Sequence, residues 1–279
     1  MIIGLDIGAG MTKGVLMKGK SIIKSLSIPT EDPYASALKV LKALLKHAQE
    51  SPVREVAVSG GGSRRAGENL LGIPVIRVDE IQAIGVGGLT LAGKSDGLIV
   101  NAGTGTAIVA AYRCGGKVVH VGGTGVGGGT LLGLAERMIG THDFEELERL
   151  AMRGDMCKVD LTVGDIVGGP IGIVPADATA SNFGKININA SREDVAAGLF
   201  NMVCQVIGVI GAIAAKAYKL ENHVIVTGGL VKSNFASEII RKTMNLFGVH
   251  PQTPENGEYC TAIGAARLLS KRKSTWFLF

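Results

Sequence analysis

The chain has 279 residues, of which 46% are hydrophobic, 4% are aromatic, 41 are Gly and only 8 are Pro. Without a Gly-X-Y period this composition excludes collagen and low-complexity disorder, and the length suits one large domain or two lobes. A formal net charge of +5 with one Trp and four Tyr argues against sequence-specific RNA recognition, which usually stacks bases on aromatic side chains.

No targeting or redox feature stands out. The four cysteines are far apart and form no CxxC pair, which favours free thiols in a reducing cytoplasm. The N-terminus lacks the features of a signal peptide, and the longest apolar stretch, Val203–Ala215, is too short to span a membrane. We therefore expect a cytoplasmic protein without a nucleic-acid or membrane partner.

The first predicted elements are typical of an α/β lobe with a mixed sheet. They are strands at Met1–Asp6, Gly14–Met17 and Lys20–Ile28, a helix over Tyr34–Gln49, strands at Val56–Ser59 and Pro74–Val78, and a helix from Glu80 to Leu91.

The order of strand, Gly-rich turn, two strands and helix then repeats. The second set is strands at Gly97–Asn101, Thr106–Arg113 and Lys117–Val121, a turn at Gly122–Gly129 and a helix over Thr130–Ile139. An insertion over about 141–190 precedes a long helix Ser191–Tyr218, a strand His223–Thr227 and helices Ser233–Phe247 and Tyr259–Ser270. This repeat predicts two similar lobes, at 1–93 and 94–279.

The first Gly-rich turn has the composition of a phosphate loop. Asp6 ends a buried strand, and Gly8 and Gly10 allow a turn whose backbone N–H groups face an anion. Asp6 would then hold Mg²⁺ directly or through water, and Lys13 would reach the transferring phosphoryl group. The alternative is a simple hairpin in which Asp6 accepts from the turn amides.

Two later segments complete a nucleotide site. Asn101–Thr106 ends a strand in the same way, so two facing hairpins could clamp a triphosphate, while the Gly-Gly turn in Val224–Asn234 would carry the adenosine. The chain has no Walker A motif, and its first Gly-rich turn leads into a strand, unlike a Rossmann fingerprint. The expected cofactors are ATP and Mg²⁺, and the expected contacts are Gly8, Gly10, Thr12, Gly103, Thr104, Gly105, Thr106, Gly125, Gly127, Gly128, Gly228 and Gly229.

With these elements in order, the chain resembles the acetate kinase–sugar kinase–heat-shock protein–actin superfamily. Its second lobe resembles the type II pantothenate kinases in five segments, Asn101–Ala107, Val121–Leu134, Arg153–Ile166, Ala178–Gly184 and Glu255–Ala265. The resemblance implies two actin-like (ribonuclease H-like) lobes with mixed sheets and an ATP cleft between them. It also implies a homodimer that transfers the γ-phosphoryl group of ATP to pantothenate, giving 4′-phosphopantothenate, the first step of coenzyme A synthesis.

The resemblance also suggests a catalytic base. Glu80 in the segment Val78–Gln82 matches the catalytic carboxylate of the family best, and a base at a helix start facing the cleft could reach the acceptor hydroxyl. Asp79 is the rival one residue away. Either carboxylate could instead only stabilise the helix dipole.

Two further regions match the family. The glycines of Gly125–Gly129 precede a helix, so their amides could bind phosphates or the acceptor carboxylate, or they could only permit close packing. Asp177, Thr179 and Asn182 match an insertion that borders the acceptor pocket in the family, or make only loop hydrogen bonds.

The acceptor pocket departs from the family. His120 stands where the family has an Arg that pairs with the pantothenate carboxylate, and imidazole cannot form a bidentate fork. Arg113, or Arg64 and Arg65, are the candidate replacements. Other departures are Gln252 and Thr253 for an aromatic pair, and Gly10 for a Thr, with Thr12 as its candidate replacement.

The alternatives are a kinase of this fold with another hydroxyl acceptor, and an ATPase activator of the 2-hydroxyacyl-CoA dehydratase type, which the first lobe also resembles. Those activators hold an iron–sulfur cluster through cysteines, but Gly123–Gly129 contains none, and Cys114 and Cys157 fall outside matching segments. The long helix Ser191–Tyr218 is the candidate dimer element, or else intrachain core.

Overall fold

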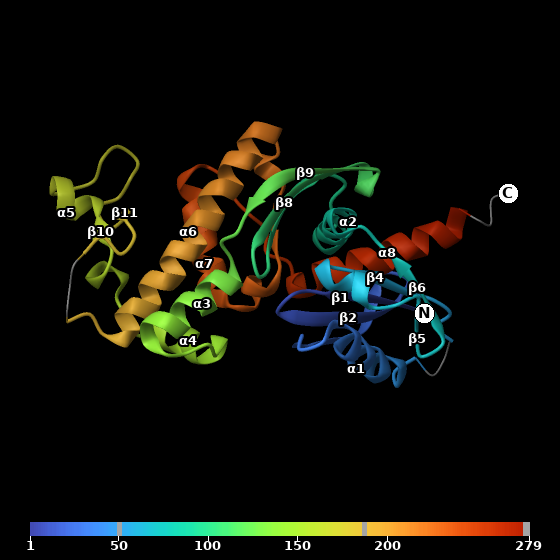
Figure 1. The fold of residues 1–279 in the computed structure, drawn as a ribbon. Helices are drawn as coiled ribbons and strands as arrows, with labels where there is room; N and C mark the ends of the chain where they lie inside the picture. The colour runs from blue at the N-terminus through green and yellow to red at the C-terminus, as the bar shows by residue number, and fades with distance from the viewer. Residues whose placement is uncertain (49–51, 186–188, 276–279) are drawn as a thin grey trace.

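The computed structural model describes residues 1–48, 52–185 and 189–275, which form two large sheets with helices around and between them, and a separate two-stranded sheet (Figure 1). The first sheet has the order β3-β2-β1-β4-β6-β5 and the second β12-β7-β8-β9. The strands are β1 (Ile2–Ile7), β2 (Met11–Lys18), β3 (Ser21–Pro29), β4 (Val56–Ser59), β5 (Asn69–Leu70), β6 (Ile73–Arg77), β7 (Gly97–Ala102), β8 (Thr106–Tyr112), β9 (Lys117–Thr124) and β12 (Val224–Thr227).

Each sheet begins with an antiparallel hairpin that turns on glycines. β1 pairs antiparallel with β2 and parallel with β4, and β7 pairs antiparallel with β8 and parallel with β12. The two mixed sheets confirm the repeated pattern seen in the sequence.

Helix α1 (Pro33–Leu45) covers one face of the first sheet. Asp32 accepts the N–H of Ala35 as N-cap, and Pro33 stands at the first helical position, where its missing N–H costs nothing. Val40 and Leu44 are fully buried against the sheet. The predicted end of this helix at Gln49 lies outside the described residues.

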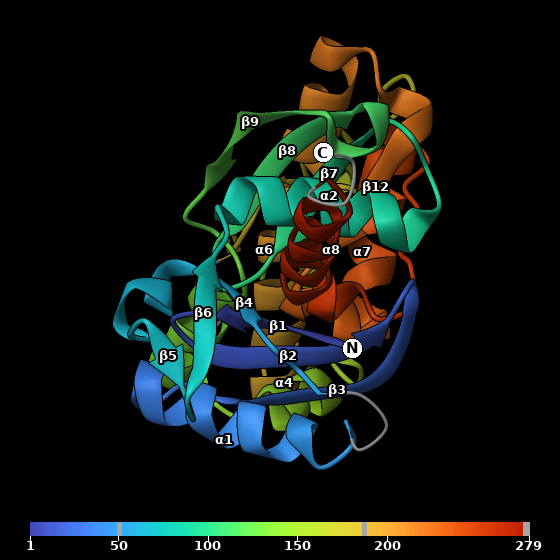
Figure 2. The same cartoon turned by 90° about the vertical axis from the view of Figure 1, so that its right-hand side faces the viewer.

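Helices α2 (Glu80–Ala92) and α8 (Cys260–Thr275) pack against each other between the two sheets (Figure 2). Only glycine permits α8 to lie so close to α2, because a Cβ on Gly264 would lie 1.8 Å from the Ala83 oxygen. The same holds where α8 meets β1, because a Cβ on Gly4 would lie 2.1 Å from the Ala262 oxygen. The sequence assigns α8 to the second lobe, yet α8 packs on β1 and β4 of the first sheet.

The other face of the second sheet is covered by α3 (Gly128–Ile139), α6 (Arg192–Tyr218) and α7 (Asn234–Leu246). In α6, Phe200 is fully buried and packs edge-on against Phe144 and Phe235. Within the described residues, α6 alone is long and apolar enough to cross a membrane, and 67% of its apolar 18-residue window is buried. That burial is typical of a core helix in a globular fold.

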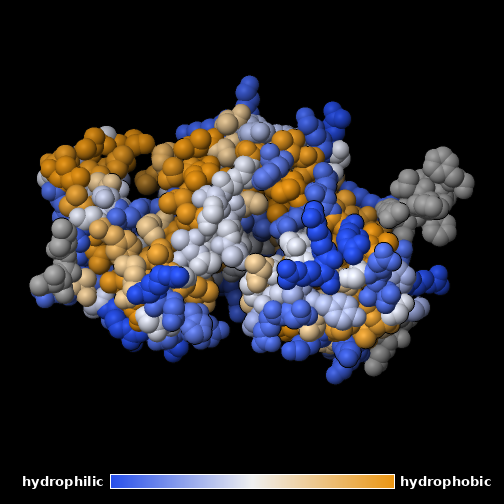
Figure 3. All heavy atoms as spheres, viewed as in Figure 1, coloured by the Kyte–Doolittle hydropathy of each residue, from blue (hydrophilic) through white to orange (hydrophobic). Residues whose placement is uncertain are grey.

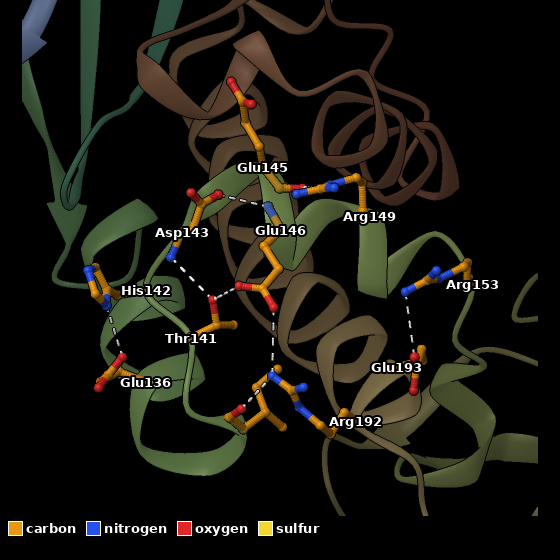
Figure 4. Close-up of polar contacts among 11 residues, drawn as sticks. Glu136, Thr141, His142, Asp143, Glu145, Glu146, Arg149, Arg153, Arg192 and Glu193 are labelled. Carbon is orange, nitrogen blue, oxygen red and sulfur yellow. Dashed lines mark hydrogen bonds and ion pairs between the residues drawn. The ribbon is translucent and has the colours of Figure 1, made fainter.

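The predicted insertion has two parts. Its first part, α4 (Phe144–Ala151), packs on α6 and belongs to the core of the second lobe. Arg192 ties the start of α6 to the segment before α4 by donating to the Ile139 carbonyl at 2.9 Å (Figure 4). The second part, β10 (Leu161–Thr162), α5 (Val163–Val167) and β11 (Thr179–Ser181), lies at the end of the molecule remote from the first sheet (Figure 1).

The predicted Gly-rich turn at 122–129 is shorter than expected. Gly122 and Gly123 continue β9 opposite Ile108 and Ala107, and α3 already begins at Gly128. Cross-strand pairing therefore overrides the weak strand propensity of glycine.

Candidate active site

Asp6 and Lys13 are direct partners across the β1–β2 hairpin. Residues alternate between the faces of a strand, and the odd-numbered Leu5 and Ile7 pack toward α1, so Asp6 and Lys13 lie on the opposite face. Gly60, with φ +87, leaves room for the Asp6 side chain, because a Cβ there would lie 2.5 Å from Asp6 Oδ1.

Ser59 is a site residue that sequence reasoning missed. It lies beside Asp6 in the parallel β1–β4 register, is fully buried, and its Oγ is one of two buried side-chain polar atoms without a hydrogen-bond partner in the described part of the chain. An unpaired buried hydroxyl is costly. Its position next to a carboxylate indicates a place for a ligand or an ordered water.

The carboxylates of the site perturb one another. Burial raises the pKa of Asp6 to about 6, against the opposing effect of Lys13, and the charge of Glu80 adds to the rise. Burial and then the charge of Asp79 raise the pKa of Glu80 as well.

The rival carboxylate, Asp79, is already engaged. It is the N-cap of α2 and accepts the N–H of Gln82 at 2.9 Å. Glu80 is the first residue of the helix. This arrangement favours Glu80 over Asp79 for proton transfer, since a base must be able to reach its proton.

Loops from the second lobe face this group. A Cβ on Gly10 would lie 3.6 Å from Thr104 Oγ1, and one on Gly229 would lie 3.6 Å from Lys13 Nζ. The two hairpin turns thus oppose each other, and Lys13 reaches the start of the 3₁₀ turn Gly229–Lys232. The surface is indented between the two halves of the molecule (Figure 3).

Several predicted amide donors are already used inside the loops. The N–H groups of Gly8, Gly103 and Gly228 donate to the carbonyls of Met11, Gly105 and Gly257. Gly127 donates to Thr130 Oγ1 at 3.3 Å, and Gly128 donates to the Gly103 carbonyl at 2.8 Å. The amides of Gly8, Gly103, Gly127 and Gly128, expected to face a phosphate or the acceptor carboxylate, and that of Gly228, at the expected adenosine site, thus donate within the loops.

Three other loop amides remain available. Within the described residues, the N–H groups of Gly10, Gly105 and Gly125 have no hydrogen-bond partner. A Cβ on Gly105 would lie 3.8 Å from the Gly125 Cα, and Gly10 faces the turn that contains Gly105. Loop glycines with unpaired N–H groups from both lobes therefore lie close together, as an anion-binding nest requires.

Two predicted hydroxyls point elsewhere. Thr12 is fully buried and shares a hydrogen bond of 2.8 Å with Thr30 Oγ1, so it cannot replace the family Thr that is missing at Gly10. Thr106 donates to the Val126 carbonyl at 2.9 Å. Both residues brace the loops.

Arg113 is at the wrong end of its strand. It follows the last residue of β8, whose first residue, Thr106, adjoins the loop, and seven residues of strand span about 23 Å. His120 is exposed on β9, opposite Val109. Arg64 and Arg65 are exposed in the 3₁₀ turn Gly61–Arg65, which directly follows Gly60, the glycine beside Asp6.

Thr179 and Asn182 lie far from Asp6 in this chain, in the remote part of the insertion (Figure 1). Both donate to the fully buried Asp160, at 3.1 and 3.3 Å, and Asn201 of α6 donates to Asp160 at 2.7 Å. The prediction of a pocket role for them is not supported within one chain. Asp160, which sequence reasoning missed, instead joins the insertion to α6.

Two mixed sheets with facing Gly-rich hairpins and an acid at the end of the first strand are the arrangement of the actin-like fold. Solved structures agree. The chain is similar to the activator of the 2-hydroxyisocaproyl-CoA dehydratase from Clostridium difficile with bound ADPNP, with TM-score 0.70, 18% identity and coverage of 100% of this chain and 98% of that one. It is also similar to a ROK family glucokinase from Streptomyces griseus in complex with glucose and AMPPNP, with TM-score 0.61, 16% identity and coverage of 96% and 98%.

The sequence comparisons define the family. The Fumble family model matches residues 97–266. The chain is 30% identical to a type II pantothenate kinase of Oceanobacillus iheyensis over 94% of its own length and 97% of the relative. It is 27% identical to one of Bacillus anthracis over 98% and 99%. The chain belongs to the type II pantothenate kinase family.

Proposed function

We propose that this protein is an ATP-dependent kinase that phosphorylates pantothenate. The observation that carries the proposal is the Asp6–Lys13 pair of the β1–β2 hairpin, with Gly10 beside Thr104 and Lys13 beside Gly229 of the second lobe, in a chain whose relatives are type II pantothenate kinases. Phosphoryl transfer needs mainly positioning and neutralisation of charge, and this group supplies both.

Mg²⁺ fits the residues around Asp6. The described residues contain no cluster of three or more His, Cys, Asp or Glu side chains suited to a metal, and Mg²⁺ commonly uses one or two carboxylates, water and phosphates. Asp6 would hold the ion, with the unpaired Ser59 hydroxyl beside it. When bound, the ion neutralises phosphate charge during transfer.

Lys13 and the amides of Gly10, Gly105 and Gly125 would hold the phosphates. Glu80 would accept the proton of the acceptor hydroxyl, since burial raises its pKa and so makes its carboxylate a better base than an ordinary one.

The acceptor carboxylate would be held by Arg64 or Arg65. They are exposed in the turn that follows Gly60, beside Asp6. Arg113 lies at the end of β8 away from the Gly103–Thr106 loop, and His120 cannot offer a bidentate fork. A changed pocket also leaves room for a second candidate, a different hydroxyl acceptor.

We further propose that the protein is a cytoplasmic homodimer. Ile213 on α6 is 59% exposed and Ile173 of the insertion is 79% exposed, and apolar residues gather over these elements (Figure 3). Exposed apolar patches often mark interfaces. Light scattering should show a dimer for the native chain and a monomer for Ile213→Asp; an unchanged mass would place the interface elsewhere.

The activity is tested with Mg-ATP and a panel of pantothenate, pantetheine and glucose, following ADP release and the mass of the product. Glu80→Gln should lower kcat by about 10²–10⁴-fold, while the neighbouring Asp79→Asn, which keeps a helix cap, should leave it near the native value. The proposal is refuted if ADP release with pantothenate matches the rate without acceptor. A brown protein with bound iron would favour the dehydratase-activator alternative.

A further inference from the structure

The central parallel strands of the two large sheets end with the same arrangement of polar residues. In the first sheet Asp6 of β1 lies beside Ser59 of β4, and in the second sheet Asn101 of β7 lies beside Thr227 of β12. Asp6 and Asn101 are each the last residue but one of their strand, and Ser59 and Thr227 are each the last. Each sheet thus places a hydroxyl beside an acid or an amide where its parallel strands end.

A glycine with positive φ follows each of these hydroxyl residues. The φ angle is +87° at Gly60 and +100° at Gly228. A Cβ on Gly60 would collide with the carbonyl of Ile7, the last residue of β1. One on Gly228 would collide with the carbonyl of Ala102, the last residue of β7. Because the backbone matches at these points, the amide of the second lobe is the counterpart of the acid of the first.

The two polar pairs lie on the sheet faces that are turned toward α2 and α8, the helices between the sheets (Figure 2). Side chains alternate between the faces of a strand. Gly4, two residues before Asp6, packs on α8. Ile99, two residues before Asn101, packs on α2. Since the turns after β1 and β7 also oppose each other, Asp6 and Asn101 border the proposed nucleotide site from opposite lobes.

The hydroxyl of the second pair orients its neighbour. Thr227 is fully buried and its Oγ1 donates to Asn101 Oδ1 at 3.1 Å. The amide oxygen of Asn101 therefore faces Thr227, and the NH₂ group faces the other way. Asn101 is half-buried, and within the part of the chain that the structure describes its Nδ2 has no hydrogen-bond partner. An amide NH₂ group can only donate, so this end of β7 presents donors.

A nearby thiol does not compete for the proton of Thr227. Burial raises the pKa of the Cys260 thiol to about 12, against the smaller effect of the Thr227 hydroxyl, so Cys260 is neutral. Its S–H donates to the Ile84 carbonyl at 3.5 Å. Because a thiol sulfur is a weak acceptor, the amide oxygen of Asn101 is the stronger partner for the Thr227 hydroxyl.

Building on the proposed use of ATP, we propose that Thr227 is a positioning residue that holds the Asn101 amide with its NH₂ group toward a phosphate oxygen of the nucleotide. Without the Thr227 hydroxyl the amide is free to turn its oxygen toward the phosphates, and an acceptor there repels them. An amide in place of a second acid also avoids one more negative charge beside a triphosphate. The first lobe thus supplies an acid and the second a fixed neutral donor.

Binding of Mg-AMPPNP to the full chain without acceptor, measured by calorimetry, tests this role. Asn101→Ala should weaken binding about tenfold, because it removes a hydrogen bond to a charged group, and Thr227→Val should weaken it about fivefold. Thr227→Ser keeps the hydroxyl and should bind like the native chain. The double variant should bind no more weakly than Asn101→Ala alone, because Thr227 acts only through Asn101.

The matched control is Thr243→Val, which removes a buried threonine hydroxyl that donates to the Ile239 carbonyl within α7 and should leave binding unchanged. Thermal unfolding without nucleotide checks that each variant is folded. Native-like binding by Asn101→Ala or by Thr227→Val overturns the proposal. So does weak binding by Thr227→Ser, or a double variant in which the two losses multiply.

The same measurement separates this role from the proposed activity. A native chain that binds Mg-AMPPNP but does not phosphorylate pantothenate refutes the acceptor alone, and the comparison of the variants still decides the role of Thr227. A native chain that does not bind Mg-AMPPNP refutes the use of ATP, and the role of Thr227 with it.

Discussion

The raised pKa of Asp6 makes a quantitative prediction about stability. Its pKa moves from 3.8 to about 6 because the carboxylate is buried. A carboxylate with a raised pKa in the folded state destabilises the fold once it ionises. The cost is absent below pH 3.8, grows between pH 3.8 and about 6, and is complete above that window. At 1.36 kcal/mol per pKa unit the full cost is about 3 kcal/mol.

Asp6→Asn removes this charge and keeps the shape of the side chain. Without nucleotide or Mg²⁺, the variant should be more stable than the native chain by about 3 kcal/mol at pH 7.5 and by roughly half of that at pH 5. Its kinase activity should be lost, because it can no longer hold the ion.

Urea unfolding at the two pH values measures the difference. The control is Asp177→Asn, which changes an exposed carboxylate and should show no such pH-dependent gain. A gain for Asp6→Asn that is the same at both pH values, or a loss at pH 7.5, would refute the assignment of a buried and unneutralised charge at Asp6. The ionised Asp6 would then not destabilise the empty active site, and a bound cation would have no such cost to relieve.

Two further predictions concern packing and the acceptor. Gly264→Ala should destabilise the protein by about 2–3 kcal/mol, because its Cβ would lie 1.8 Å from a backbone oxygen of α2. The control Gly133→Ala lies in α3, where the added Cβ would meet nothing nearer than 3.7 Å, and should stabilise the protein by up to about 1 kcal/mol. Equal urea midpoints for the two variants would contradict this prediction. Loss of Arg64 and Arg65 (both to Gln) should raise KM for pantothenate about tenfold or more with little change in kcat, whereas Arg113→Gln should not; the opposite ranking in steady-state kinetics would assign the carboxylate to Arg113.

Local patterns explain what could be predicted. The hairpins, the capped start of α1 and the start of α2 at Glu80 depend on residues close in sequence, and the family resemblance suggested Glu80 as the base. Strand alternation also separates Lys13 from Thr12: Thr12 shares the face of Gly14, which packs on Val40 of α1. That signal was present in the sequence, and counting faces along β2 would have removed Thr12 from the site.

The remaining differences depend on contacts between distant residues. Asp160 binds Thr179 and Asn201, and its spacing to them forms no local motif. The packing of α8 on the first sheet depends on Gly4 meeting Ala262, two residues more than 250 positions apart. No periodicity within α8 selects that surface over the second sheet.

The Gly-rich turns show the difference between what local sequence predicts and what contacts between distant residues decide. A Gly-rich turn in the sequence is compatible with free amides for phosphate or with close packing, and the choice depends on which carbonyls come near. The N–H of Gly128 donates to the Gly103 carbonyl and is not free for a ligand. The N–H groups of Gly10, Gly105 and Gly125, in contrast, are unpaired within the described residues. An anion site requires donors that folding leaves unsatisfied. The phosphate-binding surface is therefore built from the few glycines that packing does not use, and only the folded chain distinguishes them.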